Sequence, residues 1–393
     1  MKKFLALALA LVMMLAVFAG CSNKDDKEET GGNDTATFKI GCTGPLTGEA
    51  AIYGTAVKAG AEIAVEEINE NGGINGMQIE FSCMDDVSDG ETAVNAYNNL
   101  MDWGMQVLVG PVTTGPALSV SENAYTDRVF TLTPSASSTD VTNGKDNVFQ
   151  VCFTDPAQGT EAAEYMLENH ADSKIAAIYK NDDAYSQGIF DAFKSVLADG
   201  GVELVYEGTF TTDTSTDFSV QLAAAQAAGA DVLFLPMYYQ PASVILAQAK
   251  AANYSPLFFG VDGMDGILTL DGFDTALAEG VKVISPFSAD ETDDATVSFV
   301  EKYKEKTGET PNQFAADGYD CIYAIKAAYE AAAEAGLSMD TTEELCDALV
   351  ATFTDPDFSV DGLTGSGMTW GENGQVTKSP KVYTITDGKY VLD

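Results

Sequence analysis

Short apolar runs of strand length alternate with segments of helical periodicity along most of the chain. The apolar runs span residues 38–42, 78–84, 107–110, 129–133, 175–179, 202–210, 232–235, 257–260 and 281–285. Between the first two runs, apolar residues recur at three- and four-residue spacings from Val57 to Ile68, and Asn71-Gly72-Gly73 supplies a helix stop. Because nearly continuous apolar strands need cover on both faces, the alternation predicts an α/β fold of parallel sheets flanked by helices.

Two interruptions of this alternation predict that the chain crosses between two lobes. The run at 147–152 follows a loop rather than a helix, and a new helix begins after Phe153-Thr154-Asp155-Pro156. A second crossing is expected near Ser285-Pro286-Phe287. After it, helices at 293–307 and 314–336 would return to the first lobe, and strands at 381–386 and 389–392 would go back to the second.

The predicted architecture is therefore two Rossmann-like lobes joined by a multi-strand hinge. Lobe 1 would comprise 38–153 with 287–364, and lobe 2 would comprise 154–286 with 365–393. Two lobes on a hinge imply a cleft that can close around a ligand.

The net charge of the chain limits the kinds of molecule that it can bind. The sequence holds 60 Asp plus Glu against 20 Lys plus Arg, a formal net charge of −40. Such a surface repels phosphate backbones, so nucleic acid is excluded as a partner. We expect the acidity to serve solubility outside the cell rather than calcium binding.

The N-terminus has the features of an export signal. Lys2 and Lys3 precede an apolar run at 4–19, and residues 1–20 are predicted to be a signal peptide. Phe18-Ala19-Gly20-Cys21 resembles a lipobox, with Phe18 in place of the usual Leu, which predicts a lipid on Cys21. An uncleaved membrane anchor is the alternative, but 16 apolar residues are short for a span. The polar segment up to residue 37 is predicted to be a disordered tether, so the protein would be exported and held at the outer face of the cell membrane.

Catalytic and metal-binding patterns are weak in this sequence. Five cysteines besides Cys21 show no CxxC spacing, and a disulfide between Cys42 and Cys83 is an alternative to free thiols. The one histidine, His170, ends a predicted helix, and the paired acids at 85–86, 182–183 and 293–294 are interpreted as solvated loop residues. We expect no cofactor, no metal and no enzymatic activity, with a secreted hydrolase as the alternative from another class.

Polar residues follow the predicted strands, at the sheet edge where open parallel sheets bind ligands. The first lobe offers small hydroxyls suited to a carboxylate: Thr114, Ser135 and Ser137. The second offers rings and an acid suited to an ammonium group and an apolar body: Tyr185, Tyr238 and Asp262. Together they fit a zwitterion with a hydrophobic side chain. Each has a structural alternative, because Thr114 and Ser137 could be helix caps, Tyr238 a core or surface ring, and Asp262 a turn residue.

Several blocks of the sequence resemble the leucine/isoleucine/valine-binding proteins, type I periplasmic-binding-protein-like receptors of ABC importers. The blocks include "IGCTGPLTGEAAIYG", "VLVGPVTTGPALSV", "LTPSASST", "CFTDPAQG" and "NDDAYSQG". The resemblance implies that the residues at Thr114, Ser135 and Ser137 hold a ligand α-carboxylate. It also implies that Tyr238 and Asp262 hold the α-ammonium, and that Tyr53, Tyr185 and Tyr319 line the cleft.

The sequence departs from the family pattern at two places. The acid is commonly Glu in the family and is Asp262 here, and the disulfide of some members would fall at Ser88 and Thr113, so it is absent. The expected function is an extracytoplasmic lipoprotein, monomeric, that captures an aliphatic amino acid (Leu, Ile or Val) and delivers it to an ABC permease in the membrane. An amide, urea, a short peptide or an aromatic acid stays as an alternative ligand, and sensing as an alternative role.

Overall fold

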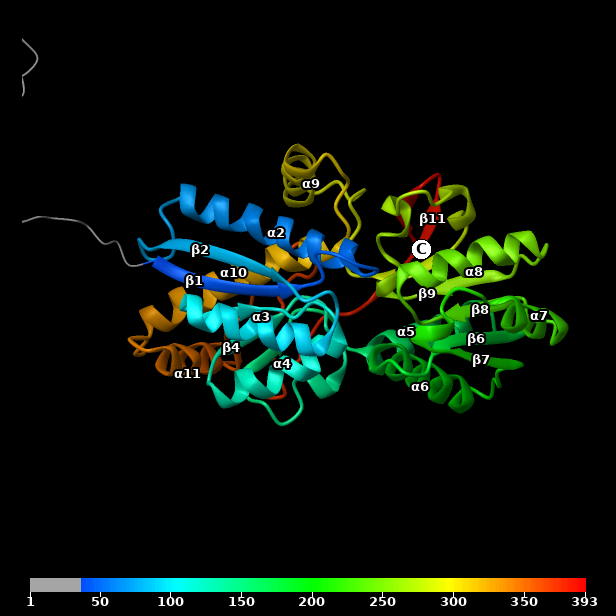
Figure 1. The fold of residues 1–393 in the computed structure, drawn as a ribbon, viewed down its shortest axis with the longest axis horizontal. Coiled ribbons are helices and arrows are strands. Elements are labelled where there is room, and N and C mark those ends of the chain that lie inside the picture. The colour runs from blue at the N-terminus through cyan, green and yellow to red at the C-terminus, as the bar shows by residue number, and fades with distance from the viewer. Residues whose placement is uncertain (1–36) are drawn as a thin grey trace, which may run out of the picture. The chain divides into compact units, whose positions relative to one another are not determined.

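The computed structural model describes residues 37–393. The predicted signal peptide, Cys21 and the predicted tether up to residue 36 lie outside the described residues. The described chain forms two sheets in two lobes, which belong to one compact unit (Figure 1).

The first sheet is parallel throughout, with the strand order β2-β1-β3-β4-β5. Its strands are β1 (Thr37–Gly44), β2 (Gln78–Asp85), β3 (Val107–Val109), β4 (Phe130–Thr133) and β5 (Val148–Gln150). One face packs against α2 (Ala51–Glu70), α10 (Gln313–Glu334) and α11 (Thr342–Phe353), and the other against α3 (Gly90–Trp103) and α4 (Thr114–Thr126). Val107 and Val109 enter the first of these cores and Leu108 the second, as the two-residue period of a strand buried on both faces requires.

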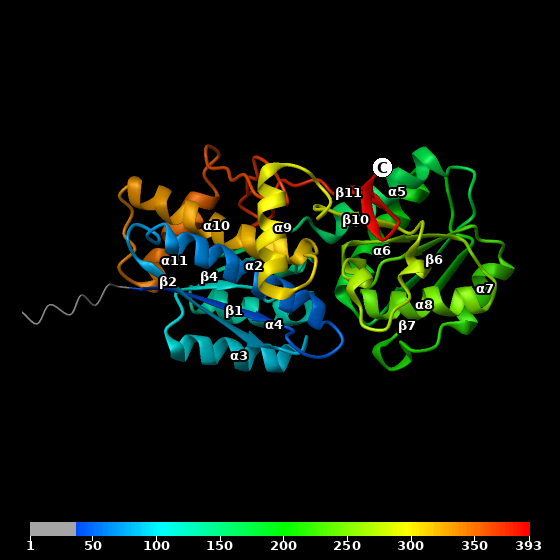
Figure 2. The same ribbon diagram turned by 90° about the horizontal axis from the view of Figure 1, so that it is seen from above.

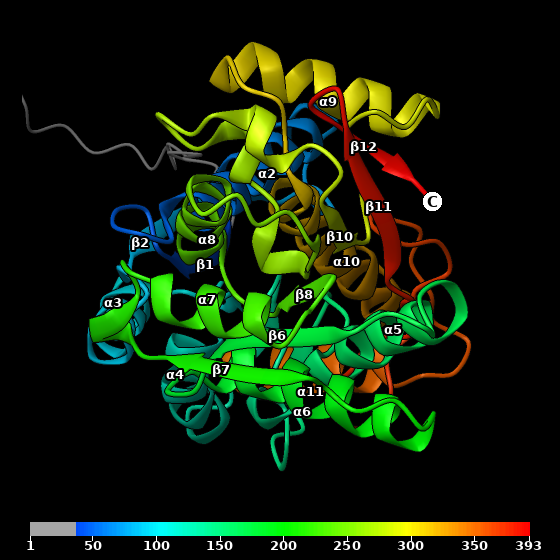
Figure 3. The same cartoon turned by 90° about the vertical axis from the view of Figure 1, so that its right-hand side faces the viewer.

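The second sheet has the order β12-β11-β10-β9-β8-β6-β7. Its strands are β6 (Ile175–Lys180), β7 (Tyr206–Phe210), β8 (Val232–Leu235), β9 (Leu257–Gly260), β10 (Lys282–Ser285), β11 (Lys381–Thr386) and β12 (Lys389–Leu392). The helices α5 (Asp155–Asn169) and α6 (Ala184–Asp199) pack on one face, and α7 (Ser219–Ala227) and α8 (Tyr239–Ala251) on the other. Figure 3 shows α7 and α8 above the strands β6 and β7, with α6 below them. Strand β11 pairs antiparallel with β10 and with β12, and the other pairings in the described sheets are parallel.

The order of crossings agrees with the predicted one. The chain passes from the first sheet to the second between β5 and α5, leaves the second after β10, and rejoins it at β11. Between those points lie α9 (Asp294–Thr307), which packs on α2, then α10 and α11 (Figure 2). The fold class is therefore the predicted one, two α/β lobes connected by several segments of chain.

Two predicted boundaries need correction. Met368 and Trp370 pack into the core of the first lobe, so residues 365–376 do not begin the second lobe as predicted. The segment 354–380 contains no helix or long strand, so no periodicity reveals where it packs. The strand predicted from residue 202 begins at Tyr206, because the Val202 N–H donates to Leu197 O in the turn that ends α6.

Local capping explains where several helices begin. The Asp89, Asp183 and Asp293 carboxylates accept hydrogen bonds from backbone N–H groups in the first turns of α3, α6 and α9. In contrast, the N-cap residues of α2, α4 and α8 (Ala50, Thr113 and Tyr238) make no side-chain capping bond in the described structure. All three of these N-cap residues line the cavities described below.

No helix among residues 37–393 combines the length and the apolar character that a bilayer span needs.

Candidate functional site

The loops at the carboxyl ends of the strands of both sheets meet at a small cavity between the lobes. Five predicted site residues line this inner cavity: Tyr53, Ser135, Tyr185, Tyr238 and Asp262. Four residues that the sequence analysis did not single out as ligand contacts complete it: Val112, Thr113, Gly263 and Phe314. Its free volume is about 10 Å³, so aromatic rings nearly fill it. An amino acid can enter only when the lobes separate or these rings move.

Tyr53 joins the two lobes. It projects from α2, its hydroxyl donates to Gly263 O, and the same hydroxyl accepts from Tyr239 N–H at 3.2 Å. Its ring centroid lies 4.5 Å from that of Phe314 and 5.3 Å from that of Tyr238. Since these partners come from opposite sides of the cleft, the structure shows the lobes in contact at the site.

Asp262 supplies a buried negative charge. It is 4% exposed, and its Oδ1 accepts from the Tyr185 hydroxyl and from Gly263 N–H. Gln158 Oε1 accepts from the Asp262 backbone N–H at 3.1 Å. Burial raises the pKa of Asp262 to about 6, although the hydrogen bonds that Tyr185 and Gly263 donate to its carboxylate lower it. At neutral pH Asp262 is therefore mostly ionised and suited to an ammonium group.

The hydroxyls of Thr114 and Ser137 are buried without a hydrogen-bond partner among the described residues. Neither is a helix cap, because the N-cap of α4 is Thr113 and the cap at 139 is Ser138. The alternative that they serve only as caps is therefore wrong. Ser135 differs, since its hydroxyl donates to Val112 O at 2.7 Å.

Tyr319 is not part of this cluster, which corrects the expectation that it lines the cleft. Its hydroxyl donates to Glu67 Oε2 at 2.7 Å, and its ring packs against Phe299 and Tyr323. On α10, Tyr319 lies five residues after Phe314, which is about 7.5 Å along the axis and about 140° around it. Phe314, not Tyr319, is the ring that α10 places at the inner cavity.

The alternatives that Tyr238 is only a core or surface ring and that Asp262 is only a turn residue each account for part of what the structure shows. Tyr239 is a buried core ring, while Tyr238 is half-buried and lines both cavities. Asp262 does bond the backbone of its own turn through Gly263 N–H, yet its burial and its Tyr185 contact go beyond turn formation.

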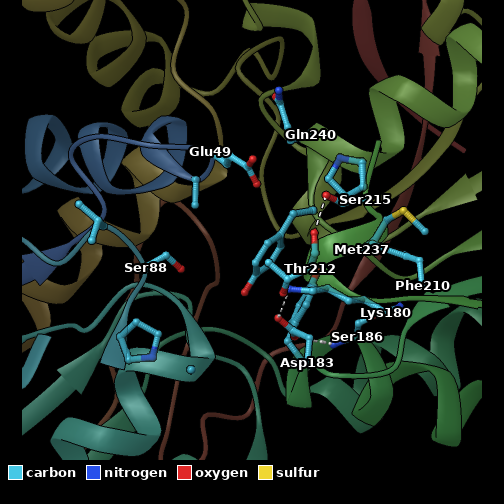
Figure 4. Close-up of a pocket in the computed structure, with 17 residues that line it drawn as sticks. Glu49, Ser88, Lys180, Asp183, Ser186, Phe210, Thr212, Ser215, Met237 and Gln240 are labelled. Atoms are coloured by element: carbon cyan, nitrogen blue, oxygen red, sulfur yellow. Dashed lines mark hydrogen bonds and ion pairs between the residues drawn. The ribbon is translucent and has the colours of Figure 1, made fainter. Parts of the chain in front are cut away.

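A larger outer chamber of about 430 Å³ adjoins the inner cavity. The rings of Tyr185 and Tyr238 line both cavities and stack with centroids 4.8 Å apart, so they form the partition. Figure 4 shows Glu49 and Ser88 facing Lys180, Asp183 and Phe210 across this chamber. Its charges are mixed, with Lys180 Nζ 3.7 Å from Asp183 Oδ2, and its apolar lining includes Val87, Phe210 and Met237.

The described structure shows no disulfide at either of the two places considered in the sequence. Cys42 and Cys83 are directly paired positions of β1 and β2, and both are free thiols. At the place of the disulfide of some family members, Ser88 Oγ and Thr113 Oγ1 form a hydrogen bond of 2.8 Å.

The interpretation of the paired acids as solvated loop residues is wrong for Asp86. Asp86 is fully buried, and burial raises its pKa to about 7. No group of three or more His, Cys, Asp or Glu side chains within 37–393 is arranged to hold a metal ion. His170 is the C-terminal cap residue of α5.

The sequence is similar to those of known binding proteins. The profile of the family described as periplasmic binding protein matches residues 37–389. The leucine-, isoleucine-, valine-, threonine-, and alanine-binding protein of Pseudomonas aeruginosa is 30% identical over 326 residues, 81% of this chain and 84% of that protein. Leu/Ile/Val-binding protein homolog 3 of Brucella melitensis is 36% identical over 230 residues, 58% of this chain, and the match spans only 62% of that relative's length.

A solved structure has the same architecture. The branched-chain amino acid transporter substrate binding protein LivJ from Streptococcus pneumoniae, in complex with isoleucine, superposes with a TM-score of 0.80. The identity is 29%, and the alignment covers 90% of this chain and 98% of that one.

Proposed function

The chain belongs to the periplasmic binding protein family, among its leucine/isoleucine/valine-binding proteins, and we propose that it captures an aliphatic amino acid between its lobes. The observation that carries the proposal is the presence of two kinds of buried polar group around the inner cavity, one from each lobe. A buried carboxylate, Asp262, lines the cavity from the second lobe. In the first lobe, the hydroxyls of Thr114 and Ser137 line neither cavity, but they are buried without a partner in the described chain, one and two residues after the lining residues Thr113 and Ser135. A zwitterionic amino acid needs both, because its ammonium group binds a carboxylate and its own carboxylate binds hydroxyl donors.

The carboxylate end of the ligand would bind at the start of α4. The first N–H groups of a helix are free to donate, and the positive end of the helix dipole favours an anion. Thr113 leaves them uncapped because its hydroxyl bonds Ser88 instead. Thr114 then offers a hydroxyl donor whose burial without a partner is otherwise unfavourable. Ser137 offers a second hydroxyl, which lies close enough to the Asp155 carboxyl to lower its pKa. Ser135 adds no free hydroxyl donor, because its hydroxyl already donates to a backbone carbonyl.

The ammonium end would bind at Asp262. Tyr185 and Gly263 hold this carboxylate in place through hydrogen bonds to its Oδ1. The ring of Tyr238 lines the same cavity and would close over the bound group.

The apolar body of the ligand would contact aromatic rings. Tyr53 from α2 and Phe314 from α10 line the inner cavity, and their centroids lie 4.5 Å apart. The relatives that bind leucine, isoleucine or valine by name make an aliphatic side chain the first choice.

The wider role follows from the family. We propose that the closed protein delivers its amino acid to the permease of an ABC importer, that it acts as a monomer, and that a lipid on Cys21 holds it at the outer face of the cell membrane. Mass spectrometry of the membrane-extracted protein tests the last point, because a diacylated N-terminal Cys21 adds the mass of two acyl chains. An N-terminus at another residue would contradict it.

The central test of the site is the substitution Asp262→Ala. Removing a buried charge that pairs with a ligand charge costs about 2–5 kcal/mol, so leucine affinity should fall at least about 30-fold in calorimetry. The control is Asp271→Ala, an exposed acid that lines a separate surface pocket, which should bind as the wild type does. Equal leucine affinity in Asp262→Ala and wild type, with both folded, would reject the site.

The outer chamber favours a second candidate, a ligand larger than leucine. Its volume of about 430 Å³ could take the rest of a short peptide or an aromatic side chain beyond the Tyr185–Tyr238 partition. This candidate predicts that a dipeptide such as Leu-Leu, or phenylalanine, binds more tightly than leucine in the same calorimetric assay.

A further inference from the structure

A second buried acid, Asp155, lies beside the proposed site. It is the first residue of α5 and is 1% exposed, and neither of its carboxylate oxygens has a hydrogen-bond partner in the described part of the chain. Its backbone is fixed, since the Asp155 N–H donates to Ser137 O at 2.9 Å. A buried carboxylate without a partner is costly, so its presence needs a reason.

The first turn of α5 lies next to the site, although Asp155 itself lines neither cavity. Gln158 lies three residues later on the same helix face, and its Oε1 holds the Asp262 backbone N–H. The Nε2 of Gln158 is itself buried without a partner among the described residues. On the other side, a Cβ at Gly188 of α6 would lie 3.1 Å from Asp155 Oδ2, so α6 closes that flank.

The groups around Asp155 do not neutralise it. Burial raises its pKa most, the acids Asp262, Asp183 and Asp140 raise it further, and the nearby Ser137 hydroxyl lowers it less than burial raises it. Tyr238 and Cys152 also sense its charge, and burial raises the pKa of both, so they stay neutral. None of these groups is a cation.

We infer that Asp155 determines specificity, because its charge makes this site select ligands carrying an ammonium group. The inference rests on the proposed function. Asp155 lies behind the cavity wall that Asp262 lines, close enough for the two charges to interact, so two acids act on a group bound at this wall. An ammonium group compensates both carboxylates, whereas a ligand with a carboxylate and no amine meets two charges of its own sign.

Proton release on binding follows from this arrangement. In the free protein the buried carboxylates hold protons at a higher pH than usual, and a bound ammonium favours their ionised forms. Binding of leucine near pH 6 should therefore release protons to the buffer, and part of that release should come from Asp155.

The test compares wild type with Asp155→Asn, using Asp271→Asn as an exposed control of equal charge change. Leucine and its des-amino analogue 4-methylpentanoate are titrated by calorimetry in two buffers of different ionisation enthalpy at pH 6 and 7.5. We expect Asp155→Asn to bind leucine at least about tenfold more weakly, to release fewer protons, and to discriminate less against the analogue. Asp271→Asn should behave as wild type.

A measurement without ligand keeps the inference testable by itself. At pH 7.5 the buried Asp155 carboxyl must either hold a proton or carry an uncompensated charge, and both cost stability. Asp155→Asn should therefore unfold at a higher temperature than wild type at pH 7.5 and show a smaller gain at pH 5. A lower unfolding temperature at pH 7.5 would mean that the carboxylate has a structural partner, which overturns the inference; Asp155→Ala gives the same comparison if the Asn variant does not fold.

The outcomes separate this inference from the proposed function. If wild type binds neither leucine, isoleucine nor valine, the proposed function fails. If wild type binds leucine while Asp155→Asn matches it in affinity, proton release and discrimination, only the role of Asp155 is rejected.

Discussion

Asp262 carries the recognition of the ligand ammonium in this account, and its ionisation decides when it can do so. Its pKa of about 6 reflects burial, opposed by hydrogen bonds from Tyr185 and Gly263. The loops after the strands led to Asp262, Tyr185 and Tyr238 from sequence alone, because ligand groups collect at carboxyl ends of parallel strands. Tyr319 and Phe314 could not be told apart, since choosing between them requires the rotation of α10 about its axis.

The pH dependence of affinity is a prediction at this scale. A bound ammonium lowers the pKa of Asp262 below its free value of about 6, so affinity is full above pH 7 and declines as the pH falls through 6. The decline should approach about tenfold per pH unit for each carboxyl that must lose its proton on binding. Calorimetry with leucine from pH 5 to 8 measures it, and equal affinities at pH 5 and 7.5 would contradict the role of Asp262.

At the scale of elements, the close packing of α2 on α10 positions Tyr53 and Phe314. A Cβ at Gly60 of α2 would lie 1.8 Å from Ala315 O, and one at Gly318 of α10 would lie 2.4 Å from Val57 O. Glycine at both positions lets the helix backbones touch. The helical period of 57–68 predicted α2 but not its contact with α10, because the spacing of glycines in one helix does not indicate which helix packs against them.

The substitution Gly60→Ala should therefore destabilise the protein. The added methyl group meets backbone, which cannot rotate away, so the helices must move apart at a cost of about 1–3 kcal/mol. Urea denaturation measures the loss. Gly115→Ala is the control: its Cβ would meet nothing within 4 Å, so it should be neutral or stabilising by up to about 1 kcal/mol. Equal stabilities of the two variants would refute the packing argument.

The Ser88–Thr113 pair gives a second prediction for the elements. It ties the loop after β2 to the N-cap of α4 through one hydrogen bond of 2.8 Å. Replacing both residues by Cys should allow a disulfide that stabilises the protein by about 3 kcal/mol, because the cross-link restricts the unfolded chain. Unfolding temperature with and without reductant measures the gain. The single variant Ser88→Cys should show none, and a reductant-independent double variant would contradict the prediction.

At the scale of the whole molecule, Lys378 ties the segments that connect the lobes. Its Nζ donates to Val151 O at 3.0 Å and to Asp317 Oδ1 at 3.1 Å, and it also reaches Thr364 Oγ1. The alternating pattern predicted two sheets and the order of crossings. It gave no information on the segment 354–380 that carries Lys378, because that segment has no period and its position depends on these contacts.

Removing this cation should loosen the connection between the lobes. Lys378→Met leaves Asp317 buried without its partner, which costs about 3–5 kcal/mol when the carboxylate is charged. The pKa of Asp317 is already raised to about 7 by burial, and losing Lys378 raises it further. The loss of stability should therefore be larger at pH 8 than at pH 6 in urea denaturation.

The matched control is Lys389→Met, which removes an exposed lysine that pairs with Asp290 at 3.1 Å. Exposed pairs contribute little, so its stability should stay close to that of wild type at both pH values. A Lys378→Met variant as stable as Lys389→Met at pH 8 would show that the buried pair does not hold the connection.

The most direct measurement of the central claim is a thermal-shift panel on the mature chain, with the twenty amino acids, benzoate, urea and a dipeptide. Leucine, isoleucine or valine should raise the unfolding temperature in a saturable way, because a ligand at 100 times its Kd adds about 2.7 kcal/mol of stability. The shift should vanish in Asp262→Ala. A panel in which no amino acid shifts the transition, or in which only benzoate or urea does, would contradict the account.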